Sequence, residues 1–455
     1  MASKNEFASK IGLIAATVGS AVGLGNVWRF PAETQANGGA AFLLVYIACV
    51  LLLGIPVMVA EFSFGRAGRS DAVGCFRNLG AKRGWWVVGG MSILASYMIL
   101  CFYMVVAGWT LEYLWTSLTG SLFNSVSSGG NFDGEFTEKM REAVTGVWNP
   151  LISTYIVILA NMAVLMIGVQ KGIERLSNIL MPMLFVILLV IVGVSMTLPG
   201  ASEGLAFFLK PDFSKITPST VLNALGQAFF SLSLGMGILV TYAAYFPKDT
   251  KLTRTAFTVS LLDLLVAFLM GLIIFPAVTS FGLQEGNLEG ATLVFVTLPE
   301  VFARMPASQL WSILFFVLLF VAALTSTISI AEVSVAFMVD RFRMSRIKAC
   351  LVVLLPLFVF STLCSLSQGE LSDFRIFGMT IFDLLDDIAT NIMLPCVSLL
   401  ICVYVGWFAP GRLLYNQVTN DGSMKSRLHG VLLFILRYMA PVMIAAILLG
   451  RFFEF

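Results

Sequence analysis

Long apolar segments recur along the whole chain, and each is about as long as a helix that crosses a lipid bilayer. Such a helix needs roughly 20 mainly apolar residues. By that criterion the chain has eleven spans, centred on Val22, Leu52, Leu100, Ile158, Ile187, Leu232, Phe268, Leu319, Leu355, Met393 and Ile444. β-Barrel strands would instead be short segments of alternating polarity. The pattern therefore predicts an all-α polytopic membrane protein.

Composition supports a membrane protein and argues against several functional classes. Only 12% of the 455 residues are charged and 58% are hydrophobic, whereas soluble domains carry about 25% charged residues. The net charge of +2 gives no reason to expect a nucleic-acid partner. A single histidine, His429, and seven scattered cysteines without CxxC spacing argue against a catalytic triad or a metal centre. We therefore do not expect an enzyme.

The positive charges predict how the chain is oriented. Twenty of the 28 Lys and Arg residues fall in the N-terminal segment and in alternate loops, on one side of the membrane. The positive-inside rule places that side in the cytoplasm. With an odd number of spans, we expect a cytoplasmic N-terminus and an extracellular C-terminus in the plasma membrane. No small-residue cleavage site follows the short polar N-terminus, so no removable signal peptide is expected.

Two spans are interrupted by small and polar residues at the depth of the bilayer centre. The first carries three glycines, a serine and an asparagine between Gly19 and Asn26, and the sixth carries Ser231, Ser233, Gly235 and Gly237. Such interruptions at matching positions of inverted halves mark transporter binding sites. Small residues also permit close helix packing, but the polar side chains favour a site because unpaired polar groups are costly in lipid.

The spacing of the interruptions predicts an internal repeat. The two interrupted spans are five apart, so the second five-span block inserts upside down relative to the first. We expect one transmembrane transporter domain over residues 1–455, built as a 5+5 inverted repeat from about 9–197 and 218–408 with an extra helix at about 430–453. Interrupted helices expose N–H groups and carbonyls, which attract an anionic group and a cation. The pattern therefore predicts a cation-coupled transporter of a small anionic or zwitterionic solute.

Four sequence motifs carry a family resemblance. They are GSAVGLGNVWRFP (Gly19 to Pro31), GIPVMVAEFSFGR (Gly54 to Arg66), FFSLSLGMG (Phe229 to Gly237) and ALTSTISI (Ala323 to Ile330). Through them the sequence resembles the neurotransmitter:sodium symporter family, most of all its eleven-helix bacterial branch of multi-substrate hydrophobic amino-acid transporters. The resemblance implies the leucine-transporter fold, two Na⁺ sites and amino-acid uptake by alternating access.

The resemblance also assigns ligands to the two sodium ions. The first site would comprise the Ala21 carbonyl, Asn26, Ser231 and the substrate carboxylate. The second would comprise the carbonyls of Gly19, Val22 and Ala322 with the hydroxyls of Thr325 and Ser326. Residues at i, i+3 and i+4 share a helix face, which supports grouping Ala322, Thr325 and Ser326 in one site. Alternatively, the hydroxyls of this span bond back to their own helix.

The substrate site implied by the resemblance lies between the two breaks. The substrate carboxylate would bind the backbone of Gly23, Leu24 and Gly25 and the Tyr103 hydroxyl. The substrate amino group would bind Ser233 and backbone carbonyls of the sixth span, in the stretch that includes Ser231 and Gly235. The side-chain pocket would be lined by Ile99, Tyr103, Phe230, Met236, Ser326 and Ile330. A flexible Met between two glycines suits large apolar side chains. We expect hydrophobic and aromatic L-amino acids as substrates.

Asp263 departs from the pattern of the chloride-dependent members of the family. It is a lone carboxylate among leucines of the seventh span, and a charge in that setting is a functional candidate. We expect it to supply a fixed negative charge near the first sodium, which would make transport independent of chloride.

Charged residues near the ends of the spans suggest two gates. By resemblance, Arg29 and Asp386 would close the outer vestibule, whereas Lys4 and Asp340, with Tyr245 nearby, would occupy the cytoplasmic gate. The alternative is that these charges simply reach toward water at the interface.

A glycine and a proline ten residues apart suggest a hinge in the fifth span. Gly172 favours fraying and Pro182 removes a helix hydrogen bond. We expect the stretch between them to unwind and open a water path to the second sodium site, although ordinary kinking explains most such prolines.

A cation channel built on the same broken helices is the alternative function. A channel needs a continuous polar lining, and apart from the two breaks the spans are apolar. Saturable, Na⁺-dependent accumulation of substrate would separate the two.

Overall fold

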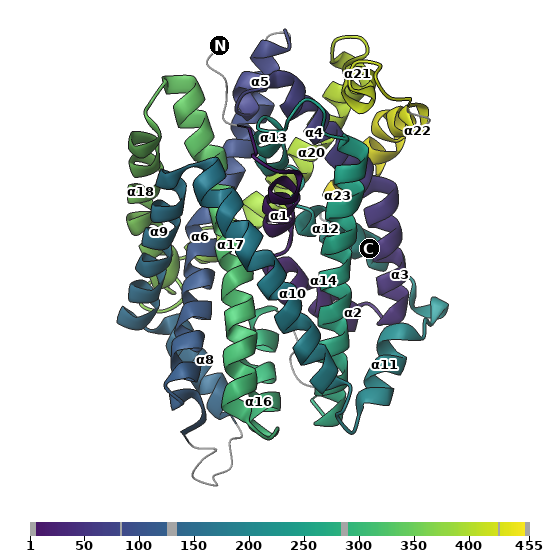
Figure 1. Cartoon of the computed structure of the whole chain (residues 1–455). Helices are drawn as coiled ribbons and strands as arrows, with labels where there is room; N and C mark the ends of the chain where they lie inside the picture. Colours follow the sequence, from purple (N-terminus) through teal and green to yellow (C-terminus); the bar gives the residue numbers. More distant parts are fainter. Residues whose placement is uncertain (1–5, 82–83, 125–133, 284–289, 426–427, 451–455) are drawn as a thin grey trace.

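A computed structural model describes residues 6–81, 84–124, 134–283, 290–425 and 428–450 of the chain. Throughout these ranges the regular structure is helical, and the only β contact is an isolated bridge between Ile376 and Met379. Figure 1 shows the helices as one bundle, most of them running along a common direction.

Nine helical segments within these ranges are long and apolar enough to cross a membrane. Five are single helices: α6 (Trp86–Leu118), α9 (Trp148–Ile167), α14 (Leu252–Ser280), α17 (Ser308–Phe342) and α18 (Arg346–Leu366). The longest two, α6 and α17, pack against each other and run through the bundle (Figure 1).

The other four segments contain π-helical turns. In the first, α3 (Ala40–Cys49) and α4 (Ile55–Gly68) are joined through the turn Val50–Gly54, and in the second, α10 (Arg175–Ser195) follows the turn Val169–Glu174. In the third, α19 (Ile381–Asp386) and α20 (Leu394–Val403) are joined through Asp387–Met393, and a further turn, Tyr404–Phe408, follows α20. In the fourth, α22 (His429–Phe434) and α23 (Ala440–Gly450) are joined through Ile435–Met439.

Two further spans are interrupted, as the sequence predicted. α1 (Lys10–Ala21) is followed after a three-residue break by a π-helical turn (Gly25–Arg29) and α2 (Phe30–Ala36), and the two parts are bent by 54°. α12 (Pro218–Ser231) and α13 (Ile238–Ala243) are separated by residues 232–237. Neither α12 nor α13 is long enough to cross a bilayer alone. The predicted count of eleven is reached only when this pair and the bent pair are each taken as one span.

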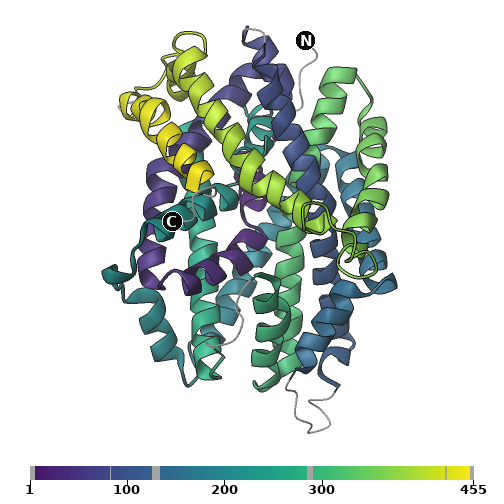
Figure 2. The same cartoon turned by 180° about the vertical axis from the view of Figure 1, so that it is seen from behind.

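Short helices connect the spans at the two ends of the bundle. They are α5 (Ala72–Asn78), α8 (Glu135–Thr145), α11 (Ala201–Leu209), α15 (Gly290–Thr292), α16 (Leu298–Ala303) and α21 (Leu413–Thr419), with single turns at Ser121–Phe123, Phe213–Lys215 and Leu293–Thr297. α5, α21 and α22 lie at the same end as the start of the chain, here called the N-terminal face, and α8, α11 and α16 lie toward the opposite end (Figures 1 and 2).

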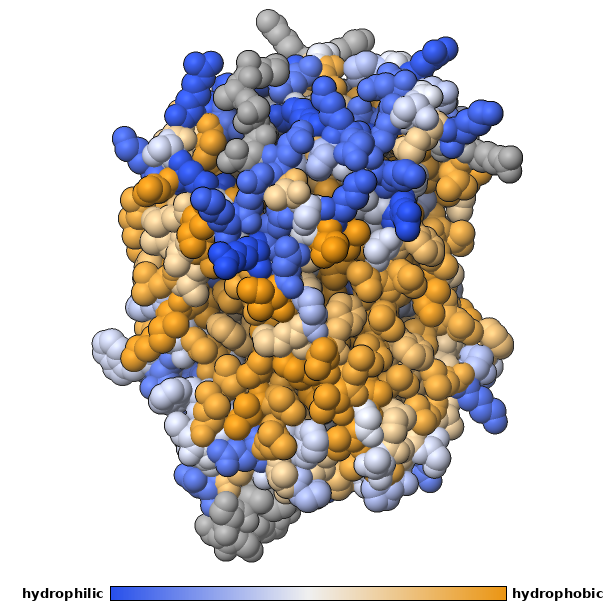
Figure 3. Space-filling model, viewed as in Figure 1, coloured by the Kyte–Doolittle hydropathy of each residue, from blue (hydrophilic) through white to orange (hydrophobic). Residues whose placement is uncertain are grey.

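The surface has the polarity of a membrane protein. On the face shown in Figure 3, hydrophobic residues form a broad zone across the middle of the bundle, and hydrophilic residues gather at the N-terminal face. Leu52, Leu189 and Val359 are each more than half exposed, which is favourable only where lipid covers them. These features confirm the predicted all-α polytopic membrane fold.

Candidate functional site

The two helix breaks lie side by side inside the bundle. The Ser233 hydroxyl donates a hydrogen bond to the Ser20 carbonyl at 2.9 Å, and Gln227 Nε2 donates to the Gly25 carbonyl at 2.9 Å. These carbonyls lie at or beside the first break, where a helix end leaves backbone groups without intrahelical partners. Because Gln227 and Ser233 are buried, the second broken span directly covers the polar backbone of the first.

One buried polar cluster joins the first break to α14. Asn26 Nδ2 donates to Asp263 Oδ1 at 2.8 Å and to Ser231 Oγ at 3.1 Å, and Ser231 Oγ lies 2.8 Å from Asp263 Oδ2. The Tyr46 hydroxyl donates to Asp263 Oδ2 at 3.4 Å. Asn26, Asp263 and Tyr46 are fully buried. The structure thus supplies the partners of Asp263, and Ala21, the other predicted ligand of the first sodium, is the last residue of α1.

Tyr46 belongs to this cluster although the sequence analysis did not select it. A tyrosine within an apolar span usually finds a partner for its hydroxyl when it is buried. Its position within the apolar span that contains α3 was therefore the feature of the sequence that could have identified Tyr46.

A second polar cluster joins the first break to α17. Ser326 Oγ lies 3.3 Å from the Val22 carbonyl and 3.5 Å from the Gly19 carbonyl. Thr325 lies next to them, since a Cβ added at Gly19 would be 3.4 Å from Thr325 Cβ. The Thr325 hydroxyl bonds back to the carbonyls of its own helix, at 3.0 Å to Val321 and 3.1 Å to Ala322. The sequence left open whether these hydroxyls face the first break or bond back to their own helix. Ser326 faces the break, and Thr325 bonds back to its helix.

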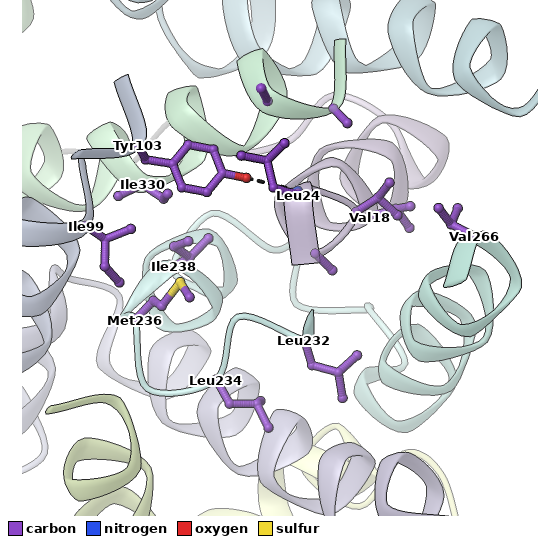
Figure 4. Close-up of a cluster of buried hydrophobic side chains, with 14 of the residues drawn as sticks. Val18, Leu24, Ile99, Tyr103, Leu232, Leu234, Met236, Ile238, Val266 and Ile330 are labelled. Carbon is purple, nitrogen blue, oxygen red and sulfur yellow. Dashed lines mark hydrogen bonds between the residues drawn. The ribbon is translucent and has the colours of Figure 1, made fainter. Parts of the chain in front are cut away.

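Tyr103 faces the first break from α6. Its hydroxyl accepts a hydrogen bond from the Leu24 N–H at 3.1 Å, as Figure 4 shows. A Cβ at Gly23 would lie 2.9 Å from this hydroxyl and 2.7 Å from Ser326 Oγ. Only glycine therefore fits where these two side chains approach the backbone.

Apolar side chains lie around the ring of Tyr103. Ile99, Met236 and Ile330 lie around the Tyr103 ring in Figure 4, and all three are buried. The Phe230 ring lies against Gly25, where a Cβ would be 3.0 Å from two ring carbons. The predicted pocket residues are thus brought together beside the breaks.

The second break is fixed by its own backbone and by two neighbours. Ser233, Gly235 and Gly237 adopt positive φ angles of 54°, 79° and 74°. The Gly235 N–H donates to Glu61 Oε1 at 2.8 Å, and Ser96 Oγ donates to the Met236 carbonyl. The sequence analysis quoted the motif that contains Glu61 without selecting it. A carboxylate within an apolar span was the signal for this residue.

The outer-gate residues Arg29 and Asp386 do not form an ion pair in this conformation. The Arg29 guanidinium lies 4.8 Å from the Phe230 ring centroid, and Arg29 Nε lies 4.0 Å from Glu33 Oε1. Asp386 Oδ1 instead accepts from the Thr390 hydroxyl at 3.2 Å. A cavity of about 330 Å³ lies at this place, lined among others by Arg29, Phe230 and Thr390.

Of the predicted cytoplasmic gate, Lys4 lies outside the described residues. Asp340 Oδ2 accepts the Asp71 N–H at 2.8 Å at the start of α5. The Tyr245 hydroxyl donates to Glu332 Oε1 at 2.9 Å, and Arg346 binds both oxygens of Glu332, at 3.0 and 2.6 Å. The ion pair between buried Glu332 and half-buried Arg346 was missed by the sequence analysis, although a glutamate inside the eighth span was again the signal.

The predicted hinge is helical in this structure. Gly172 lies in a π-helical turn where a Cβ would be 2.3 Å from the Val164 carbonyl, and Pro182 lies inside α10. Between them, Glu174 accepts the Ala8 N–H at 2.8 Å and the Ser9 N–H at 3.0 Å. The start of this segment therefore holds the residues that precede α1.

The other end of the hinge reaches the second polar cluster. A Cβ at Gly19 would lie 3.5 Å from Met181 Sδ, next to Pro182. A movement of this stretch would therefore disturb both the segment before α1 and the cluster around Gly19.

A membrane bundle in which two broken helices meet at a buried site of carbonyls, hydroxyls and one carboxylate is the architecture of a secondary transporter. The sequence profile of the sodium:neurotransmitter symporter family matches residues 4–128 and 132–455. The chain belongs to that family, whose members are transporters rather than enzymes and use Na⁺.

Individual relatives agree with this assignment. The sodium-dependent transporter YhdH of Bacillus subtilis is 37% identical over 98% of this chain and 97% of its own length. The sodium-dependent serotonin transporter of Drosophila melanogaster is 30% identical over 80% of this chain and 64% of its length. The crystal structure of MhsT in complex with L-phenylalanine is 40% identical, covers 98% of this chain and 100% of its own, and superposes with a TM-score of 0.88. This structural match confirms the predicted fold.

Proposed function

We propose that the protein is a symporter that takes up hydrophobic and aromatic L-amino acids with Na⁺ by alternating access. The observation that carries the proposal is the Tyr103 hydroxyl on the first break, with apolar Ile99, Met236 and Ile330 around its ring. The hydroxyl and the N–H groups of the break, which now bond to neutral side chains, suit a carboxylate, and the apolar walls suit an uncharged side chain. The likeness to MhsT, which was crystallised with L-phenylalanine, supports this substrate class.

We infer two sodium sites, one at each of the two polar clusters. The first would use the Ala21 carbonyl with Asn26, Ser231 and Asp263, and the second would use the carbonyls of Gly19, Val22 and Ala322 with Thr325 and Ser326. Each cluster consists mainly of oxygen atoms, which hard cations prefer as ligands. The Ser326 hydroxyl already lies within 3.5 Å of two of these carbonyls.

Asp263 would make transport independent of chloride. Its carboxylate contacts Asn26 and Ser231 directly, so a negative charge is part of the first cluster without a bound anion. Uptake measured after gluconate replaces chloride should stay within about twofold of its original rate. Loss of uptake under gluconate would contradict this role.

Arg29 and Asp386 would pair when the outer side closes, and Lys4 would pair with Asp340 near Tyr245 when the inner side closes. Asp386→Asn should then slow uptake while Na⁺ binding is retained. Equal losses in both measurements would speak against a gate.

The hinge between Gly172 and Pro182 would unwind to release the second sodium to the cytoplasm. Its contact with Gly19 through Met181 supports this role. Hydrogen exchange at residues 172–182 should then slow when Na⁺ is added, and exchange that ignores Na⁺ would count against the hinge.

In the membrane, the N-terminal face would lie in the cytoplasm. The positive-inside rule supports this orientation, because Arg77 of α5 and Arg412, which precedes α21, lie at that face. The C-terminus would then be extracellular in the plasma membrane.

The test of the whole proposal is uptake of a radiolabelled amino-acid panel into proteoliposomes at constant chloride. Leu, Ile, Val, Phe and Trp should accumulate only with an inward Na⁺ gradient. Flux that does not saturate would favour the channel alternative, although buried apolar residues fill the surroundings of the breaks. Accumulation without a Na⁺ gradient would refute the coupling.

A further inference from the structure

A basic cavity lies at the N-terminal face, away from the two helix breaks. It has a volume of about 430 Å³ and lies between the end of the tenth span, α21 and the last span. Its lining includes Trp407, Arg412, Tyr415, His429 and Arg437. None of these residues belongs to the transport site described above.

Arg437 is held in place by the tenth span. Its Nε donates to the Gly406 carbonyl at 2.6 Å, and its guanidinium lies 5.3 Å from the centroid of the Trp407 ring. A Cβ at Gly406 would be 3.1 Å from Arg437 Cγ, so glycine permits the close approach. The bond to Gly406 uses one of the five guanidinium N–H donors. The guanidinium is therefore held in place at the lining of this cavity, and the bond to Gly406 leaves its other donors unused.

Arg412 enters the cavity from another element. It immediately precedes α21 and has a φ of +74°, a conformation that costs a non-glycine residue about 1–2 kcal/mol. His429, Leu433 and Arg437 are four residues apart, which places them on one face of the last span. Among the described residues, no carboxylate lies within 4.0 Å of Arg412 or Arg437. The cavity therefore gathers positive charge that no carboxylate of the described residues pairs with at this distance.

The side chains next to the cavity indicate a ligand that has an apolar part, as a lipid does, in addition to a negative charge. Trp407, Phe408, Phe434 and Tyr438 are each half-exposed or more, and aromatic residues of this kind mark the level of the lipid headgroups. The Tyr438 ring packs against Trp407 and Phe434. An apolar surface thus continues directly from the basic cavity.

We propose that this cavity binds the phosphate of an anionic phospholipid, with Arg412 and Arg437 on the phosphate and the aromatic surface against the acyl chains. Arginine suits phosphate because its planar donors can bind two oxygens at once. Basic pockets between membrane helices on the cytoplasmic side are suited to anionic headgroups. The proposal does not depend on which substrate the transporter carries.

Native mass spectrometry of the full chain in detergent tests the proposal. Wild-type protein should bind phosphatidylglycerol at least tenfold more tightly than phosphatidylcholine. The double substitution Arg412→Gln and Arg437→Gln should remove most of this preference. Arg77→Gln, which removes an exposed arginine of α5 at the same face, is the matched control and should leave the preference unchanged.

A second variant keeps the test decisive if the double variant does not fold. Arg412→Gln alone removes an exposed side chain and should weaken phosphatidylglycerol binding several-fold while Na⁺-driven uptake is retained. Unchanged lipid preference in both variants would overturn the proposal, as would an equal loss in Arg77→Gln. Competition by inorganic phosphate at concentrations similar to those of the lipid would show that the ligand is a soluble phosphate, and the lipid assignment would be wrong.

Discussion

The two helix breaks are held open in different ways. The first spans only Val22–Leu24, has no residue with positive φ, and is contacted by the neutral side chains of Asn26 and Tyr103. The second spans residues 232–237, places three residues at positive φ, and is held at Gly235 by the carboxyl group of Glu61. The N–H groups of Gly23 and Leu24 are therefore bonded only to neutral side chains, which a bound ligand can replace, whereas the second break is a preformed wall.

If the second break is such a wall, the largest effect should come from a substitution that changes its backbone. Gly235→Ala places a methyl group 2.4 Å from the Leu394 carbonyl, at a φ of +79°. The left-handed conformation alone costs about 1–2 kcal/mol, and the clash with backbone adds to it. We expect loss of transport and a strongly lowered thermal unfolding temperature in detergent.

Gly226→Ala is the matched control for this substitution. It adds the same methyl group to α12 at a position where no atom beyond the adjoining helix backbone lies within 4 Å. Transport should stay near wild type, because alanine also favours a helix. Normal transport by Gly235→Ala would show that the second break is mobile, and the contrast between the breaks would fail.

The next largest effect should separate the two buried carboxyl groups. Asp263→Asn removes the carboxylate of the first cluster, whereas Glu61→Gln keeps an oxygen that can accept from the Gly235 N–H. We expect Asp263→Asn to raise the Na⁺ concentration for half-maximal uptake at least tenfold, which corresponds to about 1.4 kcal/mol. Glu61→Gln should leave this concentration within about threefold and lower the maximal rate instead.

Chloride sharpens this comparison between the two carboxyl groups. If Asp263 supplies the charge of the first site, added chloride should partly restore uptake by Asp263→Asn and leave Glu61→Gln unaffected. Equal Na⁺ dependence of both variants would mean that the carboxyl groups serve the same purpose, which contradicts the difference drawn here.

The sequence predicted both breaks because polar and small residues stand out within an apolar span. Asn26, Ser231 and Asp263 were found in this way, and the structure brings them within hydrogen-bond distance of one another. Spacing along one helix cannot show which distant helix faces a residue. The contacts of Tyr46 with Asp263 and of Glu61 with Gly235 depend on packing between spans, so they were missed.

Hydroxyl groups show a different limit of sequence reasoning. Thr325 and Ser326 are neighbours in one motif, yet Thr325 bonds back to α17 while Ser326 points to the first break. The two orientations depend on side-chain torsions and on the position of α1. The gates differ again: Arg29 lies against Phe230 and Asp386 against Thr390 in this conformation, and spacing along the chain does not encode which conformation a transporter adopts.

A smaller effect is expected where α1 is attached to the hinge. Glu174→Gln keeps one acceptor oxygen, so the N–H groups of Ala8 and Ser9 can no longer both bind a carboxylate oxygen. A hydrogen bond to a charged group contributes about 1.5–3 kcal/mol. We expect roughly tenfold faster hydrogen exchange at the start of α1, with exchange in the second break unchanged.

Glu203→Gln, in α11 near the opposite end of the bundle, is the control for this measurement and should not alter exchange in α1. Faster exchange in residues 232–237 of Glu174→Gln would mean that the two breaks respond together rather than separately.

The smallest effect is expected at the mouth of the first break. Tyr103→Phe removes the hydroxyl that accepts the Leu24 N–H but keeps the ring that packs near Ile99 and Met236. A net hydrogen bond is worth about 1 kcal/mol, so the substrate concentration for half-maximal uptake should rise about fivefold. Because the hydroxyl acts on the carboxylate, the increase should be the same for leucine and for phenylalanine. An increase that differs between these substrates would place Tyr103 at the side-chain end of the pocket, and the first break would then not be the part of the site that binds the carboxylate.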